Sequence, residues 1–184
     1  MIYHPTRVAG AFVVERQPHT DHRGSFARAW CAAEARTHGL ADQIAQVNVS
    51  RNRLRGTLRG LHYQATPHAE AKLIACTAGA LYDVVVDLRP NSPTFLAWDA
   101  VELDAESERQ LYVPPGCAHG FQTLRDNTQV LYLMSTPHAP RAARGIRYDD
   151  PTLHITWPLP VTAISETDLA WPFCDPDGLP PANP

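Results

Sequence analysis

The stretch "AKLIACTAGALYDVVVDL", residues 71–88, decides the fold class of this chain. It contains two apolar runs on either side of Gly79. Successive side chains of a strand point to opposite faces, and this alternation separates Leu81, Asp83, Val85 and Asp87 from Tyr82, Val84, Val86 and Leu88. Lys72 and Asp83 interrupt the apolar pattern. Burying such groups is costly unless they have partners or a function, so their presence needs a reason.

Short apolar runs recur along the whole chain, punctuated by 17 prolines and 10 glycines. This pattern is typical of an all-β sandwich or barrel. Strands are predicted at residues 10–16, 45–51, 60–64, 71–79, 80–90, 95–103, 109–114, 120–124 and 129–135. Only two short helices are predicted. Residues 31–38 end before Gly39, a residue suited to a helix C-terminus, and residues 165–169 begin with Ser165 as a cap.

Length and composition predict a single domain spanning residues 1–184, with residues 172–184 as a loosely held proline-rich tail. The 16 basic and 19 acidic residues nearly balance, which gives no sign of binding to nucleic acid or membrane. No apolar run is long enough for a transmembrane helix, and the N-terminus lacks the features of a secretion signal. The four cysteines are scattered, which predicts free thiols in the cytoplasm.

Polar side chains share strand faces with apolar ones at several places in the chain. Alternation groups Gln46 with Asn48 and Ser50, His62 with Gln64, Glu70 with Lys72 and Ile74, and Tyr132 with Val130 and Met134. Each group taken singly also fits an edge or surface position, where such side chains are common. Their coincidence on several strands predicts the wall of a pocket between two curled sheets.

Arg59 does not fit this scheme, because it lies three residues before His62 and an ideal strand would place the two on opposite faces. Gly60 lies between them and could mark a bulge that turns one side chain toward the other.

The turn "PPGCAHGF", residues 114–121, resembles the second half of the cupin motif, with His119 at the mouth of a small barrel. Longer motifs extend the resemblance: "RGTLRGLHYQ" (55–64), "DVVVDLRPNSPTFLAWDAVEL" (83–103), "DHRGSF" (21–26), "QVNVS" (46–50), "YDDPTLHITWP" (148–158) and "ISETD" (164–168). Together they resemble the dTDP-4-dehydrorhamnose 3,5-epimerase family, in order, from about residue 10 to residue 170.

This resemblance implies a cupin-type jelly-roll fold, a homodimer, and an isomerase that needs no metal or other cofactor. The implied reaction is inversion at C3, C5 or both in a nucleoside-diphosphate 4-keto-6-deoxysugar. Proton removal beside a ketone requires a base over the carbon and stabilisation of the enolate oxygen. By the matching motifs, His62 is the base, Asp168 orients it, Lys72 faces the C4 oxygen, and Tyr132 returns a proton from the opposite face.

Further residues are placed by the same resemblance. Asp83 and His119 form a supporting polar pair, and Gln46 and Asn48 contribute to substrate binding. Arg23 and Arg59 are assigned to the diphosphate, which forked guanidinium donors suit. Phe26 and Trp30 are assigned to the nucleoside, and residues near 10–28 are expected to complete the partner subunit's site.

Two positions depart from the family pattern. Arg28 in "RGSFAR" replaces the usual glutamate at the base-binding end, so a cytidine, uridine or guanosine diphosphate sugar stays open beside thymidine. His138 replaces a usual tyrosine six residues after Tyr132, so inversion at one carbon only also stays open. Each change also fits a neutral exchange at a surface or pocket rim.

Two other classes compete with this interpretation. A metal-dependent cupin would use His62, Glu70 and His119 as ligands, although Lys72 would place a positive charge beside the cation. A non-catalytic module that binds a sugar nucleotide is the second, since a fold does not establish an activity. The presence of His62, Lys72, Tyr132 and Asp168 together argues for an enzyme.

Overall fold

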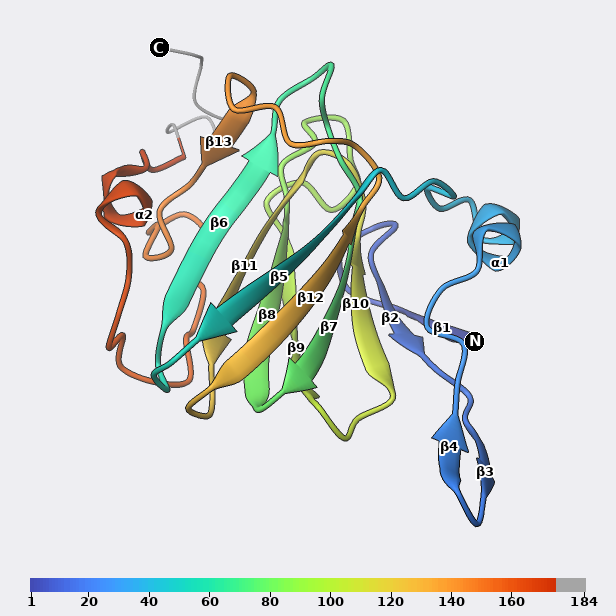
Figure 1. Ribbon diagram of the computed structural model, residues 1–184. Coiled ribbons are helices and arrows are strands. Elements are labelled where there is room, and N and C mark those ends of the chain that lie inside the picture. Colours follow the sequence, from blue (N-terminus) through green and yellow to red (C-terminus); the bar gives the residue numbers. More distant parts are fainter. Residues whose placement is uncertain (175–184) are drawn as a thin grey trace.

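The computed structural model describes residues 1–174 as two facing β-sheets with two short helices (Figure 1). Its elements are β1 (Ile2–Pro5), β2 (Phe12–Glu15), β3 (His19–Asp21), β4 (Gly24–Phe26), α1 (Ala32–Thr37), β5 (Gln46–Asn52), β6 (Leu58–Gln64), β7 (Lys72–Ala78), β8 (Ala80–Asp87), β9 (Trp98–Asp104), β10 (Arg109–Val113), β11 (Cys117–Thr123), β12 (Thr128–Met134), β13 (Ala143–Gly145) and α2 (Glu166–Ala170). One sheet has the order β1-β2-β10-β7-β12-β5 and the other the order β13-β6-β11-β8-β9. Strands β3 and β4 form a separate hairpin that projects from the body (Figure 1).

The main core fills the space between the two sheets. Its buried side chains come from both, with Leu81, Val85 and Phe121 on one side and Ile74 and Val130 on the other. Removing this apolar surface from water is the main favourable term in holding the sheets together. The predicted all-β sandwich is therefore confirmed.

The two faces predicted for the stretch at residues 80–88 are also confirmed. Leu81 and Val85 face the other sheet, whereas Val84 and Val86 belong to a second cluster on the outer face, with Ile146 among its members. Segments after β13 cover this outer face, which explains why both faces of β8 are apolar.

The predicted strands and helices all form, within a few residues at their ends. Ser165 caps α2 by accepting a hydrogen bond from the Asp168 backbone N–H, and Gly39 follows α1 with a φ of +69°. Four strands were missed by the sequence analysis: β1, β3, β4 and β13. They have only three or four residues each, too few for an alternating apolar pattern to stand out.

A bulge in β6 resolves the conflict between Arg59 and His62. In the pairing with β11, His119 lies opposite His62 and Phe121 lies opposite Arg59, so two residues of β6, Gly60 and Leu61, oppose the single residue Gly120 of β11. Gly60 has a φ of +138°, and a Cβ there would lie 2.6 Å from the Gly120 Cα atom. Only glycine fits such a backbone at this approach. The bulge places Arg59 and His62 on the same inward side.

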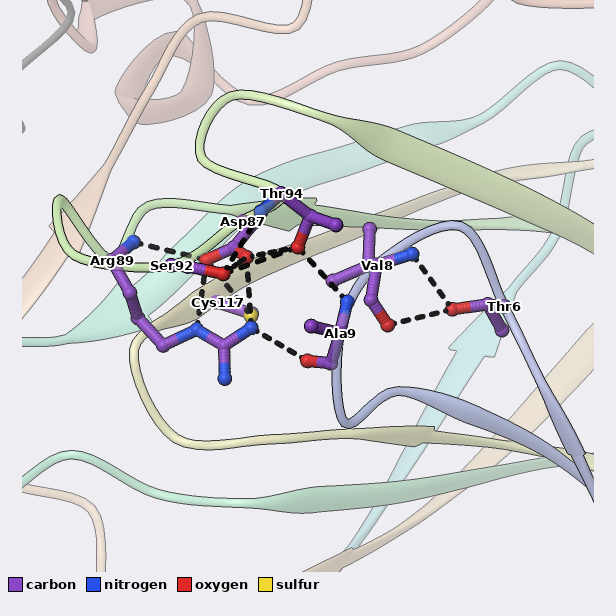
Figure 2. A network of polar contacts seen from close by, with 8 residues as sticks. All are labelled: Thr6, Val8, Ala9, Asp87, Arg89, Ser92, Thr94 and Cys117. Carbon is purple, nitrogen blue, oxygen red and sulfur yellow. Dashed lines mark hydrogen bonds and ion pairs between the residues drawn. The ribbon is translucent and has the colours of Figure 1, made fainter.

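A network around Asp87 joins the end of β8 to the following turn and to the N-terminal segment. Figure 2 shows the buried Asp87 carboxylate accepting hydrogen bonds from Arg89, Ser92 and Thr94. The Arg89 guanidinium also donates to the Ala9 carbonyl at 2.6 Å. Burial by itself would raise the pKa of Asp87, but these hydrogen bonds outweigh it and lower the pKa to about 2.

The end of the described chain is held more firmly than predicted. Pro172 accepts a hydrogen bond from the Arg147 backbone, and the Cys174 backbone donates to Asp150, so residues 172–174 are not a loose tail. Residues 175–184, the rest of the predicted tail, lie outside the described residues. Cys31, Cys76 and Cys117 are free thiols, as predicted. Within residues 1–174, no helix is both long and apolar enough to cross a membrane.

Candidate active site

A cavity of about 430 Å³ lies between the two sheets, lined by β5, β7 and β12 of one sheet and by β6, β11 and β13 of the other. Its wall contains seven of the predicted site residues: Asn48, Arg59, His62, Lys72, His119, Tyr132 and His138. His62 and His119 come from β6 and β11 of one sheet, whereas Lys72 and Tyr132 come from β7 and β12 of the other. The predicted pocket wall therefore forms, with polar side chains on both of its sides.

A second cavity, of about 730 Å³, shares Tyr63, Gln64 and Arg144 with the first. It is larger, but none of the predicted catalytic side chains lines it. The smaller cavity is therefore the candidate active site, because it alone collects the titratable groups that proton transfer requires.

His62 is held by a carboxylate from far along the chain. Its Nε2 atom lies 2.7 Å from Asp168 Oδ1, and Asp168 Oδ2 accepts a hydrogen bond from the Gly60 backbone N–H at 3.2 Å. Burial by itself would raise the pKa of Asp168, but the hydrogen bond and charge of His62 and the Gly60 N–H lower it overall. An ionised Asp168 keeps the proton of a neutral His62 on Nε2, which leaves Nδ1 with a lone pair.

Lys72 is tethered in the opposite wall by two acceptors. Its Nζ atom lies 3.0 Å from Glu70 Oε1 and donates to the His62 carbonyl at 2.9 Å. An ammonium group has three N–H donors, so one remains for a ligand in the cavity. The lysine is therefore both fixed in place and able to act as a donor.

Tyr132 faces the same cavity from β12. Burial raises the pKa of its hydroxyl, the Asp83 carboxylate raises it further, and Arg59 opposes the shift only in part. The hydroxyl therefore keeps its proton and can serve as an acid rather than as a phenolate.

The predicted pair of Asp83 and His119 lies beside Tyr132. His119 Nε2 is 2.6 Å from Asp83 Oδ1, and the His119 ring meets the Tyr132 ring edge to face with centroids 5.9 Å apart. Complete burial raises the pKa of Asp83, although the charge and hydrogen bond of His119 and the charge of Lys72 counteract part of this shift.

Polar groups at the rim are linked to one another. Arg59 Nε donates to Asn52 Oδ1 at 2.8 Å, which fixes the guanidinium at the cavity wall. Gln46 donates to Asn48 and accepts from the His138 backbone N–H, so it supports two lining residues without lining the cavity itself.

The family described as dTDP-4-dehydrorhamnose 3,5-epimerase matches residues 5–175 of the chain. A dTDP-4-dehydrorhamnose 3,5-epimerase of Sinorhizobium fredii is 38% identical over 173 residues, which cover 94% of this chain and 89% of that protein. The chain belongs to this family. The crystal structure of a family enzyme from Elizabethkingia anophelis matches with a TM-score of 0.92 and 33% identity, covering 97% of this chain and 98% of that one.

One epimerase with a narrower described activity is also similar. ChmJ, a 3'-monoepimerase from Streptomyces bikiniensis solved with dTDP-quinovose, has a TM-score of 0.85 and 37% identity. The match covers 92% of this chain and 86% of ChmJ. The predicted family, its isomerase class and its jelly-roll fold are thus confirmed. Because a protein this similar is described as a monoepimerase, membership of the family leaves open how many carbons this chain inverts.

Three predicted substrate-binding residues lie away from the epimerase cavity of their own chain. Arg23 and Phe26 are on the projecting β3–β4 hairpin, where Arg23 pairs with Asp21. Arg28 follows the hairpin and pairs with Glu34. Phe26 is 79% exposed, which is unusual for a large apolar side chain without a partner surface.

Sequence reasoning missed three functional candidates, namely Trp171, Asn52 and Glu70. Asn52 holds Arg59, and Glu70 was considered only as a metal ligand. Trp171 lines the cavity with its ring centroid 6.5 Å from that of His62. Its indole packs against Gly145, where a Cβ would lie 2.5 Å from ring atoms. A tryptophan three residues after Asp168 carried no motif, and its packing on Gly145 depends on the folded chain.

The alternative metal site does not form in the described part of the chain. His62 pairs with Asp168, Glu70 with Lys72, and His119 with Asp83. No group of three or more His, Cys, Asp or Glu side chains within residues 1–174 is arranged to hold a metal ion.

Proposed function

We propose that this epimerase inverts C3, C5 or both in a dTDP-linked 4-keto-6-deoxysugar during deoxysugar biosynthesis. The observation that carries the proposal is the placement of His62 and Tyr132 in one cavity but on different sheets. A sugar ring between the two sheets would meet a base on one face and an acid on the other. Removing a proton from one face and returning one to the opposite face is what inversion requires.

The proton transfers follow from the side-chain contacts. His62 Nδ1 takes the proton from the carbon beside the ketone, and Asp168 stabilises the resulting imidazolium. The electron pair of the broken C–H bond forms a carbon–carbon double bond to C4, and the carbonyl pair moves onto the C4 oxygen. The remaining Lys72 N–H stabilises this enolate oxygen. The pair on the C4 oxygen then re-forms the ketone, and the pair of the carbon–carbon double bond takes the Tyr132 proton from the opposite face. His62, left as imidazolium, and Tyr132, left as phenolate, exchange protons with water before the next turnover.

We further propose that the enzyme is a cytoplasmic homodimer of single-domain subunits, in which the β3–β4 hairpin completes the partner's nucleotide site. The exposed Phe26, together with Val47 and Val49 at 57% and 51% exposure on β5, supports a partner surface. In such a dimer Arg28, which follows the hairpin and pairs with Glu34, would meet the nucleobase across the interface. Sedimentation with activity measurements tests this part, and fully active monomers at high dilution would contradict it.

Proton NMR in deuterated water tests the reaction itself. The protein is incubated with the dTDP-, CDP-, UDP- and GDP-linked 4-keto-6-deoxyglucose, and deuterium is followed at C3 and C5. We expect exchange with the dTDP sugar, and losses of orders of magnitude in His62→Ala and Tyr132→Phe with nucleotide binding intact. His4→Ala and Tyr82→Phe, both outside the cavity, serve as matched controls. Full activity in His62→Ala would show that the base is another group.

A further inference from the structure

Glu70 is a buried carboxylate in the cavity wall with one oxygen unused. Its side chain is only 3% exposed, and its Oε1 atom lies 3.0 Å from Lys72 Nζ. Its Oε2 atom is buried and has no hydrogen-bond partner among the described residues. A buried acceptor without a donor is destabilising, so such an atom in a ligand cavity indicates a place where a ligand supplies the donor.

Glu70 and Lys72 both line the cavity, and they offer two different hydrogen-bonding groups there. Lys72 uses one N–H for Glu70 and one for the His62 carbonyl, which leaves one donor. Glu70 adds one acceptor, Oε2, on the carboxylate that pairs with this lysine. A ligand that fits this pair has an acceptor for Lys72 and, on a neighbouring atom, a donor for Glu70. A ketone whose adjacent carbon carries a hydroxyl group has both.

In a 4-keto-6-deoxysugar, only one side of the ketone matches this pattern. C3 carries a hydroxyl, whereas C5 carries a methyl group that cannot donate a hydrogen bond. We propose that Glu70 Oε2 accepts the hydrogen bond of the C3 hydroxyl while Lys72 holds the C4 oxygen. This inference rests on the proposed function. It makes Glu70 a positioning residue that orients the sugar ring so that C3 lies next to Glu70.

The contact also favours the intermediate of inversion at C3. When His62 removes the C3 proton, C3 and C4 become joined by a double bond, and their oxygens then lie in one plane. The C3 hydroxyl keeps its proton and its bond to Glu70, and the C4 oxygen takes the negative charge beside Lys72. Hydrogen bonds to charged groups are the stronger kind, and here both are aligned with the planar intermediate. Glu70 thus assists exchange at C3 more than exchange at C5.

The test compares deuterium incorporation at the two carbons in Glu70→Gln. Glutamine keeps an acceptor for Lys72 but places an NH₂ group where Oε2 stood. We expect the rate at C3 to fall about 10- to 100-fold more than the rate at C5, with dTDP binding unchanged. Glu108→Gln, which removes a carboxylate paired with Arg16 outside the cavity, should leave both rates unchanged.

A second arm uses the wild-type protein with the 3-deoxy analogue of the substrate. The analogue lacks the donor, so it should bind about 10- to 100-fold more weakly. This arm remains informative if the glutamine variant fails to fold.

Equal losses at C3 and C5 would mean that Glu70 serves only as the counter-ion of Lys72, and unchanged rates would mean that it has no role in the reaction. Either result overturns the inference, as does wild-type exchange at C5 alone, while the epimerase activity stands. No wild-type exchange with any of the four nucleotide sugars would overturn the proposed function and this inference with it.

Discussion

Asp168→Asn is the sharpest perturbation of the proposed base, because both oxygens of this carboxylate accept hydrogen bonds. One faces His62 Nε2 at 2.7 Å and the other faces the Gly60 N–H at 3.2 Å. Asparagine has only one acceptor oxygen. If that oxygen faces Gly60, its NH₂ group faces His62 and moves the imidazole proton to Nδ1, so the base is lost. If the oxygen faces His62, the NH₂ group meets the Gly60 N–H and two donors oppose each other.

The expected loss can be bounded from these contacts. A hydrogen bond to a charged partner contributes about 1.5–3 kcal/mol, which corresponds to a fall in turnover of about 10- to 100-fold. The wrong tautomer would add to this, and such a change costs about 10⁴-fold in the catalytic triad of a serine protease. We therefore expect turnover to fall by between about 10-fold and about 10⁴-fold, with KM for the nucleotide sugar nearly unchanged.

The assay is deuterium incorporation at C3 and C5 under saturating substrate, with dTDP affinity measured separately by calorimetry. Asp149→Asn is the matched control, because Asp149 pairs with Arg147 and does not line the cavity. Turnover of Asp168→Asn within about threefold of wild type would refute the role of Asp168 in holding His62.

Three further predictions concern other parts of the molecule. The pKa of Asp87 in the folded protein is about 2, against an ordinary value of 3.8, so its carboxylate stabilises the fold fully above pH 3.8 and loses this effect as the pH falls toward 2. Asp87→Asn should therefore lower the free energy of unfolding, measured by urea titration, by about 2 kcal/mol at neutral pH and by less at acidic pH. A loss of stability that does not depend on pH would contradict the assignment. Gly145→Ala should displace Trp171, because a Cβ at residue 145 would lie 2.5 Å from indole atoms. We expect kcat/KM to fall about tenfold in steady-state assays while the fold stays intact. Unchanged kinetics would mean that Trp171 has no part in shaping the site. Dialysis against EDTA should leave the deuterium exchange rate unchanged, whereas a loss restored by a divalent metal would favour the metal-dependent alternative.

Local sequence pattern was sufficient for most of the sheet structure. Strict alternation predicted the inward placement of Asp83, Lys72 and Tyr132, because side-chain direction along a strand depends only on the local backbone. It failed between Arg59 and His62, where the bulge at Gly60 breaks the period of two. Gly60 indicated a possible bulge in the sequence, but the close approach of Gly120 from another strand, which excludes a side chain at residue 60, exists only in the folded chain.

Local sequence pattern did not predict which side chains the site residues contact. Asp168 lies 106 residues from His62 in sequence, and only the resemblance to the family linked the two before the structure brought them to 2.7 Å. The free oxygen of Glu70 and the packing of Trp171 on Gly145 had no signal in the sequence.

The sequence by itself thus determined the fold class, the family and the faces on which the titratable groups lie, because strand periodicity and long motifs are properties of the chain taken locally. The tertiary structure decided which groups meet. Hydrogen bonds and burial depend on distances of a few ångströms between elements that are far apart in the sequence, and those distances exist only once the two sheets and helix α2 have packed around the cavity.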